Sequence, residues 1–99
     1  NNSHYAAAKA GVNVLTASLA HELGPEIRCN AVASGAVPTE IFFEVMDLEP
    51  NDLPAYAKET GVPLERLGSP QDIAGAVLFL CSEASSWMTG EVMTVSGGR

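Results

Sequence analysis

The chain has 99 residues, of which 46% are hydrophobic and 17% charged, and its formal net charge is -7. This composition is typical of one globular domain and excludes a disordered chain. The 5 Lys and Arg residues are scattered, which argues against a nucleic-acid or anionic-membrane surface. No apolar run is long enough to span a bilayer and no signal peptide is visible, so we expect no membrane partner. Cys29 and Cys81 lie in apolar segments and are read as buried thiols, which fits a cytoplasmic protein.

The first expected element is a helix from Tyr5 to Leu23, because apolar residues recur there at helical spacing. The apolar stripe along this helix consists of Ala8, Val12, Leu15, Leu19 and Leu23. Ser3 is the expected N-cap residue, and Gly24-Pro25 ends the pattern.

The next segment, "IRCNAVASG", covers Ile27 to Gly35 and is short and mostly apolar or small. It predicts a strand buried on both faces, as in a parallel sheet. Four prolines then interrupt the pattern before Gly68, with two short amphipathic pieces at Glu40–Met46 and Leu53–Thr60. A long irregular segment in a compact domain is typical of a lid or binding loop, here about residues 38–66.

A second helix begins after Ser69, the expected N-cap residue, with Pro70 in its first position and Asp72 three residues after the cap. The face that we expect to be buried is formed by Ile73, Val77 and Leu80. The short strand "EVMTV" follows Gly90. Strand, crossover helix and strand predict a right-handed βαβ unit with parallel strands.

Tyr5 and Lys9 are the residues that could perform chemistry, since side chains four positions apart share one helix face. A nearby ammonium and the positive end of a helix dipole both favour the phenolate, so Tyr5 could exchange a proton with an alcohol or carbonyl oxygen. The spacing alone is also compatible with an ordinary surface Tyr and Lys. His4 and His21 are interpreted as structural or surface residues.

Two long stretches carry a family resemblance: "YAAAKAGVNVLTASLAHELGPEIRCNAVASGAV" and "RLGSPQDIAGAVLFLCSEASSWMTGEVMTVSGG". Both resemble the short-chain dehydrogenase/reductase family in order and spacing, from Tyr5 to Gly98. The resemblance implies an α/β fold, the C-terminal part of a Rossmann-type doubly wound parallel sheet in the order helix–strand–lid–helix–strand. Residues 1–99 would be a partial NAD(P)-binding domain whose N-terminal βαβ half is absent.

The resemblance also implies roles for individual residues. Tyr5 matches the catalytic acid/base, and Lys9 matches the residue that binds the nicotinamide ribose and assists the tyrosine. The residues implied to contact NAD or NADP are Tyr5, Lys9, Ser34, Gly35, Val37 and Thr39. Ser34 departs from the usual proline of the family, which we expect to loosen the turn under the nicotinamide.

The implied activity is the interconversion of a secondary alcohol and a ketone. Phe42, Phe43 and Met46 fall in the lid segment, where they are expected to contact an apolar substrate. The ending "FLCSEASSWMTGEVMTVSGG" is similar to the 7α-hydroxysteroid dehydrogenase branch, and Ser96 stands where many members carry Asp. Oxoacyl-carrier-protein reductases and sugar dehydrogenases differ little here and remain alternatives.

Two features of the family are missing from the sequence. The Gly-rich loop that holds the pyrophosphate and the catalytic Ser are both expected upstream of Asn1. We therefore expect the chain alone to be inactive, and the choice between NAD and NADP stays open.

No metal ligand set is expected. The family also implies a homotetramer, with Trp87 in the core or at a subunit contact. The rival interpretation is a truncated, non-catalytic chain that acts as an oligomer-interface module.

Overall fold

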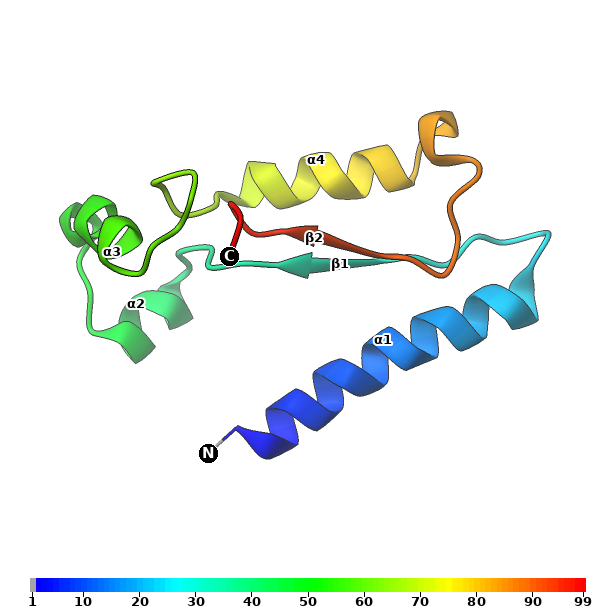
Figure 1. The fold of residues 1–99 in the computed structure, drawn as a ribbon, viewed down its shortest axis with the longest axis horizontal. Helices are drawn as coiled ribbons and strands as arrows, with labels where there is room; N and C mark the ends of the chain where they lie inside the picture. The colour runs from blue at the N-terminus through cyan, green and yellow to red at the C-terminus, as the bar shows by residue number, and fades with distance from the viewer. Residues whose placement is uncertain (1) are drawn as a thin grey trace.

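The computed structural model describes residues 2–99, an α/β arrangement with α1 and α4 on opposite sides of a pair of strands (Figure 1). The elements are, in chain order, α1 (Ser3–Leu23), β1 (Ala31–Ser34), α2 (Glu40–Met46), the 3-10 turn η1 (Pro50–Asp52), α3 (Leu53–Glu59), α4 (Pro70–Leu80), the 3-10 turn η2 (Glu83–Ser85) and β2 (Val92–Val95). None of the helices within residues 2–99 is long and apolar enough to cross a membrane.

The two strands pair in parallel, with Ala31 opposite Val92 and Ser34 opposite Val95. Helix α4 connects them and packs against both. This arrangement confirms the predicted strand–helix–strand unit with parallel strands. The lid segment, with α2 and α3, leaves β1 at its carboxyl end and returns to the start of α4 (Figure 1).

Strand β1 is shorter than the predicted strand, which covered Ile27 to Gly35. Two backbone N–H groups before Ala31 donate hydrogen bonds to partners outside the sheet. The Ile27 N–H donates to the Leu23 carbonyl at 3.0 Å, and the Cys29 N–H donates to the Thr89 hydroxyl at 3.0 Å. Residues 31–33 are half-buried and Ser34 is exposed. The prediction that both faces of this strand are buried is therefore wrong for residues 2–99. Within residues 2–99 it pairs on one side only, which leaves its other edge open.

Helix α1 starts two residues before the predicted Tyr5, so Ser3 is its first residue and not its N-cap. The reason is that the Ala6 N–H already donates to the Asn2 carbonyl at 2.8 Å. The predicted apolar stripe of α1 is also not its buried face. Thr16 and Ala20 are buried instead, and a Cβ added at Gly90 would lie 3.3 Å from the Ala20 Cβ.

The N-terminus of α4 has the predicted capping box. The Ser69 hydroxyl accepts a hydrogen bond from the Asp72 N–H at 3.3 Å, and the Asp72 carboxylate accepts one from the Ser69 N–H at 2.7 Å. Pro70 occupies the first helical position, as predicted. Val77 does not share the half-buried face of Ile73 and Leu80, because its side chain is 46% exposed.

A hydrogen-bonded clamp joins the other end of α4 to the segment before β1. The Arg28 guanidinium donates to the Leu80 carbonyl at 2.7 Å and to the Met88 carbonyl at 3.0 Å. The Asn30 side chain donates to the Met88 carbonyl and accepts from the Glu91 N–H. These bonds fix the crossover between α4 and β2 without an apolar core.

The lid helices match the sequence closely. Helix α2 covers Glu40–Met46 as predicted, and α3 ends at Glu59, one residue before the predicted Thr60. The return segment of the lid rests on the end of the chain, since a Cβ at Gly98 would lie 2.8 Å from the Pro63 Cγ. Gly98 has a φ of 98°, a conformation that favours glycine.

Buried apolar side chains are few, namely Ala20, Ala57 and Val62. Trp87 is 99% exposed, which contradicts the expectation that it packs in a core within residues 2–99. Its other expected role, at a subunit contact, stays a prediction.

Candidate functional site

The candidate site lies at the end of the molecule where both strands finish. Parallel strands place their carboxyl ends at one edge, and ligands of open α/β sheets bind outside that edge. Residues 35–39 follow β1 and residues 96–98 follow β2, so both segments lie there. The N-terminus of α1 and helix α2 are found at this same end (Figure 1).

The structure brings Tyr5 and Lys9 together in the first turns of α1. The Lys9 Nζ lies 5.4 Å from the centroid of the Tyr5 ring, within the range of a cation–π interaction. The Tyr5 side chain is 59% exposed, so a ligand can approach it. His4, its neighbour in sequence, is exposed.

Val37 offers an unpaired backbone donor just beyond β1. Its N–H finds no backbone acceptor among residues 2–99. The Thr39 hydroxyl accepts a hydrogen bond from the Phe42 N–H at 3.3 Å, which caps α2 and leaves the hydroxyl proton available to a ligand. This N–H and this hydroxyl proton lie two residues apart and are both open to a ligand, and the predicted contacts of Val37 and Thr39 with a cofactor stay predictions.

Gly35 is required by packing between the two strand ends. A Cβ at this position would lie 2.7 Å from the Ser96 Cα, and the Gly35 N–H donates to the Val95 carbonyl at 2.9 Å. Side chains essentially never approach so closely, so the two chain segments can meet only over a glycine. The neighbouring Ser34 is exposed at the end of β1. The predicted contacts of Ser34 and Gly35 with a cofactor stay predictions.

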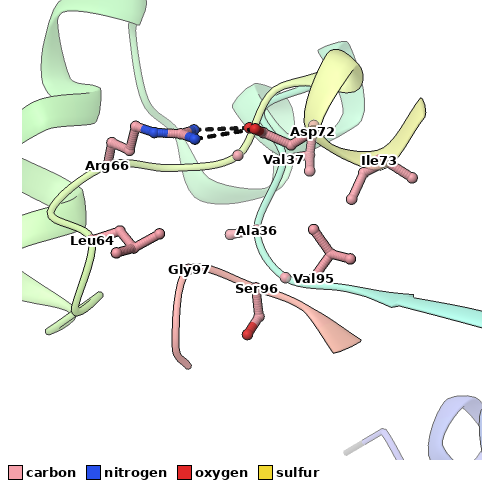
Figure 2. Close-up of a pocket in the computed structure, with 11 residues that line it drawn as sticks. Ala36, Val37, Leu64, Arg66, Asp72, Ile73, Val95, Ser96 and Gly97 are labelled. Carbon is pink, nitrogen blue, oxygen red and sulfur yellow. Dashed lines mark hydrogen bonds and ion pairs between the residues drawn. The ribbon is translucent and has the colours of Figure 1, made fainter. Parts of the chain in front are cut away.

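Two cavities adjoin this strand edge. The first, of about 130 Å³, includes Ala36, Val37, Val95 and Ser96 in its lining, and Figure 2 shows these residues around it. The second, of about 300 Å³, is lined by residues from both strand ends and from the return of the lid. Tyr5 and Lys9 line neither of these two cavities. The Tyr5–Lys9 pair lies at the same end of the molecule as the loop after β1. Within residues 2–99, no hydrogen bond joins this pair to that loop.

An ion pair closes one wall of the first cavity. The Arg66 guanidinium donates to the Asp72 carboxylate at 2.8 and 3.1 Å, as the dashed lines in Figure 2 show. Hydrogen bonds from Arg66, and then from Ser69, hold the pKa of Asp72 well below its usual range, and the same pairing raises the pKa of Arg66. Sequence reasoning missed Arg66, because only the fold brings it to the N-terminus of α4.

The predicted lid residues pack mainly within the lid. The Phe42 ring meets the Phe43 ring edge-to-face at 6.0 Å and the Tyr56 ring edge-to-face at 5.8 Å. The Tyr56 hydroxyl lies 3.9 Å from the Met46 sulfur. Tyr56 was missed by sequence reasoning because no local motif marks it. Within residues 2–99 no group of three His, Cys, Asp or Glu side chains could hold a metal ion.

The whole chain is similar to known oxidoreductases. A family model described as enoyl-(acyl carrier protein) reductase matches residues 1–99. The 7α-hydroxysteroid dehydrogenase of Escherichia coli strain K12 is 43% identical over 99% of this chain and 37% of its own length. The structure of a 7α-hydroxysteroid dehydrogenase complexed with NADH and 7-oxo glycochenodeoxycholic acid superposes with a TM-score of 0.85 and 42% identity, over 99% of this chain and 37% of that one.

A second similar solved structure contains bound NADPH. It is an NADPH-bound short-chain oxidoreductase from Pseudomonas aeruginosa, with a TM-score of 0.84 and 36% identity over 93% of this chain and 37% of that one. The chain thus spans less than two fifths of the length of the relatives it matches.

Proposed function

Because the chain belongs to the short-chain dehydrogenase/reductase family of oxidoreductases, with its Rossmann-type NAD(P) fold, we propose that it supplies the acid/base end of an enzyme interconverting a secondary alcohol and a ketone. The observation that carries this proposal is the pairing of Tyr5 with Lys9 at the exposed start of α1, 5.4 Å from ammonium to ring centroid. Residues 1–99 would form part of the NAD(P)-binding domain, with the lid at about residues 38–66.

Tyr5 is the proposed proton donor and acceptor. In the reducing direction its hydroxyl gives a proton to the carbonyl oxygen, and in the oxidising direction it takes the proton of the alcohol. The Lys9 ammonium and the N-terminal end of α1 both place positive charge near the ring, which stabilises the phenolate formed when the proton leaves. Both side chains are therefore assigned to catalysis.

The loop after β1 is proposed to orient the nicotinamide group. The unpaired Val37 N–H and the Thr39 hydroxyl would bind its carboxamide, and Ser34 and Gly35 would form the adjacent surface. Lys9 and Tyr5 would bind the ribose hydroxyls. When bound, the cofactor supplies or accepts the hydride, while the chain binds, orients and exchanges the proton.

The substrate is proposed to be apolar, a hydroxysteroid or another apolar alcohol. Support comes from the printed name of the 43% identical relative and from the apolar residues of the lid, Phe42, Phe43 and Met46. Two relatives named 3-oxoacyl-(acyl-carrier-protein) reductase, 42% and 43% identical to this chain, favour an oxoacyl-carrier-protein substrate as the alternative within the same reaction class. A sugar dehydrogenase is the remaining alternative.

A homo-oligomer, as a tetramer, is also proposed. Trp87 is 99% exposed and Leu78, on α4, is 72% exposed. Exposed large apolar side chains mark interaction surfaces when they gather. If the chain has no catalytic role, such a surface would make it an oligomer-interface module, the second candidate function.

The test is turnover by the full-length protein, meaning the longest protein that its gene encodes around residues 1–99. Purified protein is mixed with NADH or NADPH and either an oxosteroid or an oxoacyl thioester. In a third reaction it is mixed with NAD+ or NADP+ and an aldose, which would be oxidised. Change in nicotinamide absorbance with the oxosteroid supports the proposal. Turnover of the thioester alone selects the alternative substrate, and no turnover of any substrate contradicts the enzyme assignment.

A further inference from the structure

Helix α2 has two apolar faces, and one of them contacts α3. Phe42, which is half-buried, and Met46, which is 45% exposed, are four positions apart on this face and meet Tyr56. Ile41 and Val45, also four positions apart, are each 71% exposed. One residue corresponds to about 100° of rotation in an α-helix, so the two faces are separated by about a quarter turn.

Tyr56 holds this rotation through two contacts at once. Its ring meets the Phe42 ring edge-to-face with centroids 5.8 Å apart, and its hydroxyl lies 3.9 Å from the Met46 sulfur. The contacts are one helical turn apart on α2, and together they resist rotation of the helix about its axis. No residue of α2 is fully buried, so little else in the described chain restrains it.

The start of α2 borders the proposed nicotinamide loop. Thr39 caps α2 and lies two residues after Val37, whose N–H is unpaired. Ile41 is in the first turn of α2, so the exposed pair begins next to the place where the reacting ring would be held. A substrate must lie against that ring, which makes its apolar body the fitting occupant of the exposed face.

We propose that Tyr56 is a positioning residue that sets the rotation of α2, so that Ile41 and Val45 contact the apolar body of the substrate. Phe42 and Met46 then hold α2 against α3 through Tyr56. This assignment rests on the proposed alcohol/ketone activity and deepens it, because it names the residues that select an apolar substrate.

The experiment is a double-mutant cycle in the full-length protein, with an oxosteroid as substrate. Ile41→Ala and Tyr56→Ala are each expected to raise KM about tenfold with little change in kcat, the loss expected when an apolar contact is truncated. With Tyr56 removed, Ile41 is no longer held in place, so the double variant should be about as impaired as either single variant. Tyr56→Phe keeps the ring contact and should restore KM to within about threefold of wild type.

Substrate size supplies the matched control. A small acyclic ketone cannot reach the whole exposed face, so its KM should change less than about twofold in the same variants. The proposal is overturned if Ile41→Ala leaves the oxosteroid KM unchanged, or if the two single effects simply multiply. A change of oligomeric state in Ile41→Ala, without a change in KM, would assign the exposed face to a second copy of the chain and would also overturn it.

The oxidation rate of Met46 tests the role of Tyr56 in the lid independently of the proposed alcohol/ketone activity. Peroxide oxidation of Met46, followed by mass spectrometry, should be faster in Tyr56→Ala than in wild type, with Met88 and Met93 as internal controls. If oxidation responds as expected but Tyr5→Phe retains full turnover, the enzyme mechanism has failed and the lid packing has not. If Met46 oxidation does not change, Tyr56 does not hold α2 and the proposal is contradicted.

Discussion

The β1–α4–β2 unit and helices α1 and α2 differ in the hydrogen bonds that tie them to distant parts of the chain. Within the unit, the strands pair in register, Arg28 bonds two carbonyls, and Ser69 and Asp72 cap α4. Large apolar side chains are open to solvent in both regions, with Leu78 of α4 72% and Ile41 of α2 71% exposed, so apolar burial does not distinguish them.

The proposed chemical roles fall on the segments with fewer long-range hydrogen bonds. Tyr5 and Lys9 belong to α1, and the proposed substrate contacts belong to α2. The strand–helix–strand unit supplies the edge from which the proposed cofactor loop extends. The comparison therefore separates a scaffold from the segments that act on the substrate, and mutations in each should have different consequences.

The largest stability effect is expected where the two strand ends meet. Gly35→Ala would place a methyl group 2.7 Å from the Ser96 Cα, where backbone must move, so we expect about 1–3 kcal/mol of destabilisation. Thermal unfolding of the full-length protein measures it. Gly75→Ala, in α4, is the matched control, since nothing lies within 4 Å and alanine favours a helix by about 1 kcal/mol.

An equal loss of stability in Gly35→Ala and Gly75→Ala would show that glycine content, and not the contact with Ser96, sets the effect. A rise in the unfolding temperature of Gly75→Ala beside a fall in Gly35→Ala would sharpen the distinction between the packed strand edge and the open helix surface.

A smaller effect is expected at the cap of α4. Ser69→Ala removes the hydroxyl that accepts from the Asp72 N–H and should lower the free energy of unfolding by about 1 kcal/mol. Ser69→Asn or Ser69→Asp should retain most of it, because both are good N-cap residues. If alanine were as stable as serine while asparagine were not, the cap would not be what stabilises the helix.

The smallest effect concerns pH. Arg66 and Ser69 depress the folded pKa of Asp72 below its unfolded value of about 3.9. The stabilisation is thus fully present above about pH 4 and is lost as pH falls toward the depressed folded value. Asp72→Asn should therefore unfold at a lower temperature than wild type at neutral pH, with the difference shrinking in strong acid and at high salt.

Asp52→Asn is the control for this titration. Asp52 accepts a hydrogen bond from the Glu49 N–H at 2.8 Å, in a cap like that of Asp72. The ion pair between Arg66 and Asp72 is the only side-chain salt bridge found within residues 2–99. A difference between Asp72→Asn and wild type that does not change with pH would argue against the ion pair.

The sequence predicted best those elements whose ends are marked by local chemistry. The start of α4 at Ser69-Pro70 is predicted because a cap residue acts on neighbours a few positions away, and α2 matches the amphipathic piece Glu40–Met46. The buried side of a helix is predicted poorly. Val12, Leu15 and Leu23 of the α1 stripe and Val77 of α4 are exposed in the structure, because burial depends on distant partners.

The same limit applies to the candidate site. The Tyr5–Lys9 pair could be predicted because four-residue spacing alone brings two helical side chains together. Arg66 and Tyr56 could not, since no local motif marks either contact: Arg66 reaches Asp72 across the turn before α4, and Tyr56 meets Phe42 of another helix. Phe42 packs against Tyr56 of α3, and its expected contact with an apolar substrate stays a prediction.

The most direct test of this account removes one hydroxyl from each of two tyrosines in the full-length protein. Tyr5→Phe is expected to lower kcat at least about a hundredfold, the typical contribution of acid/base catalysis, while the dissociation constants of NADH and NADPH rise by no more than about tenfold, the loss of one hydrogen bond. Tyr56→Phe should retain kcat within about threefold of wild type, because its hydroxyl only contacts Met46. Full activity in Tyr5→Phe, or an equal loss of kcat in both variants, would contradict the assignment of the acid/base to the start of α1.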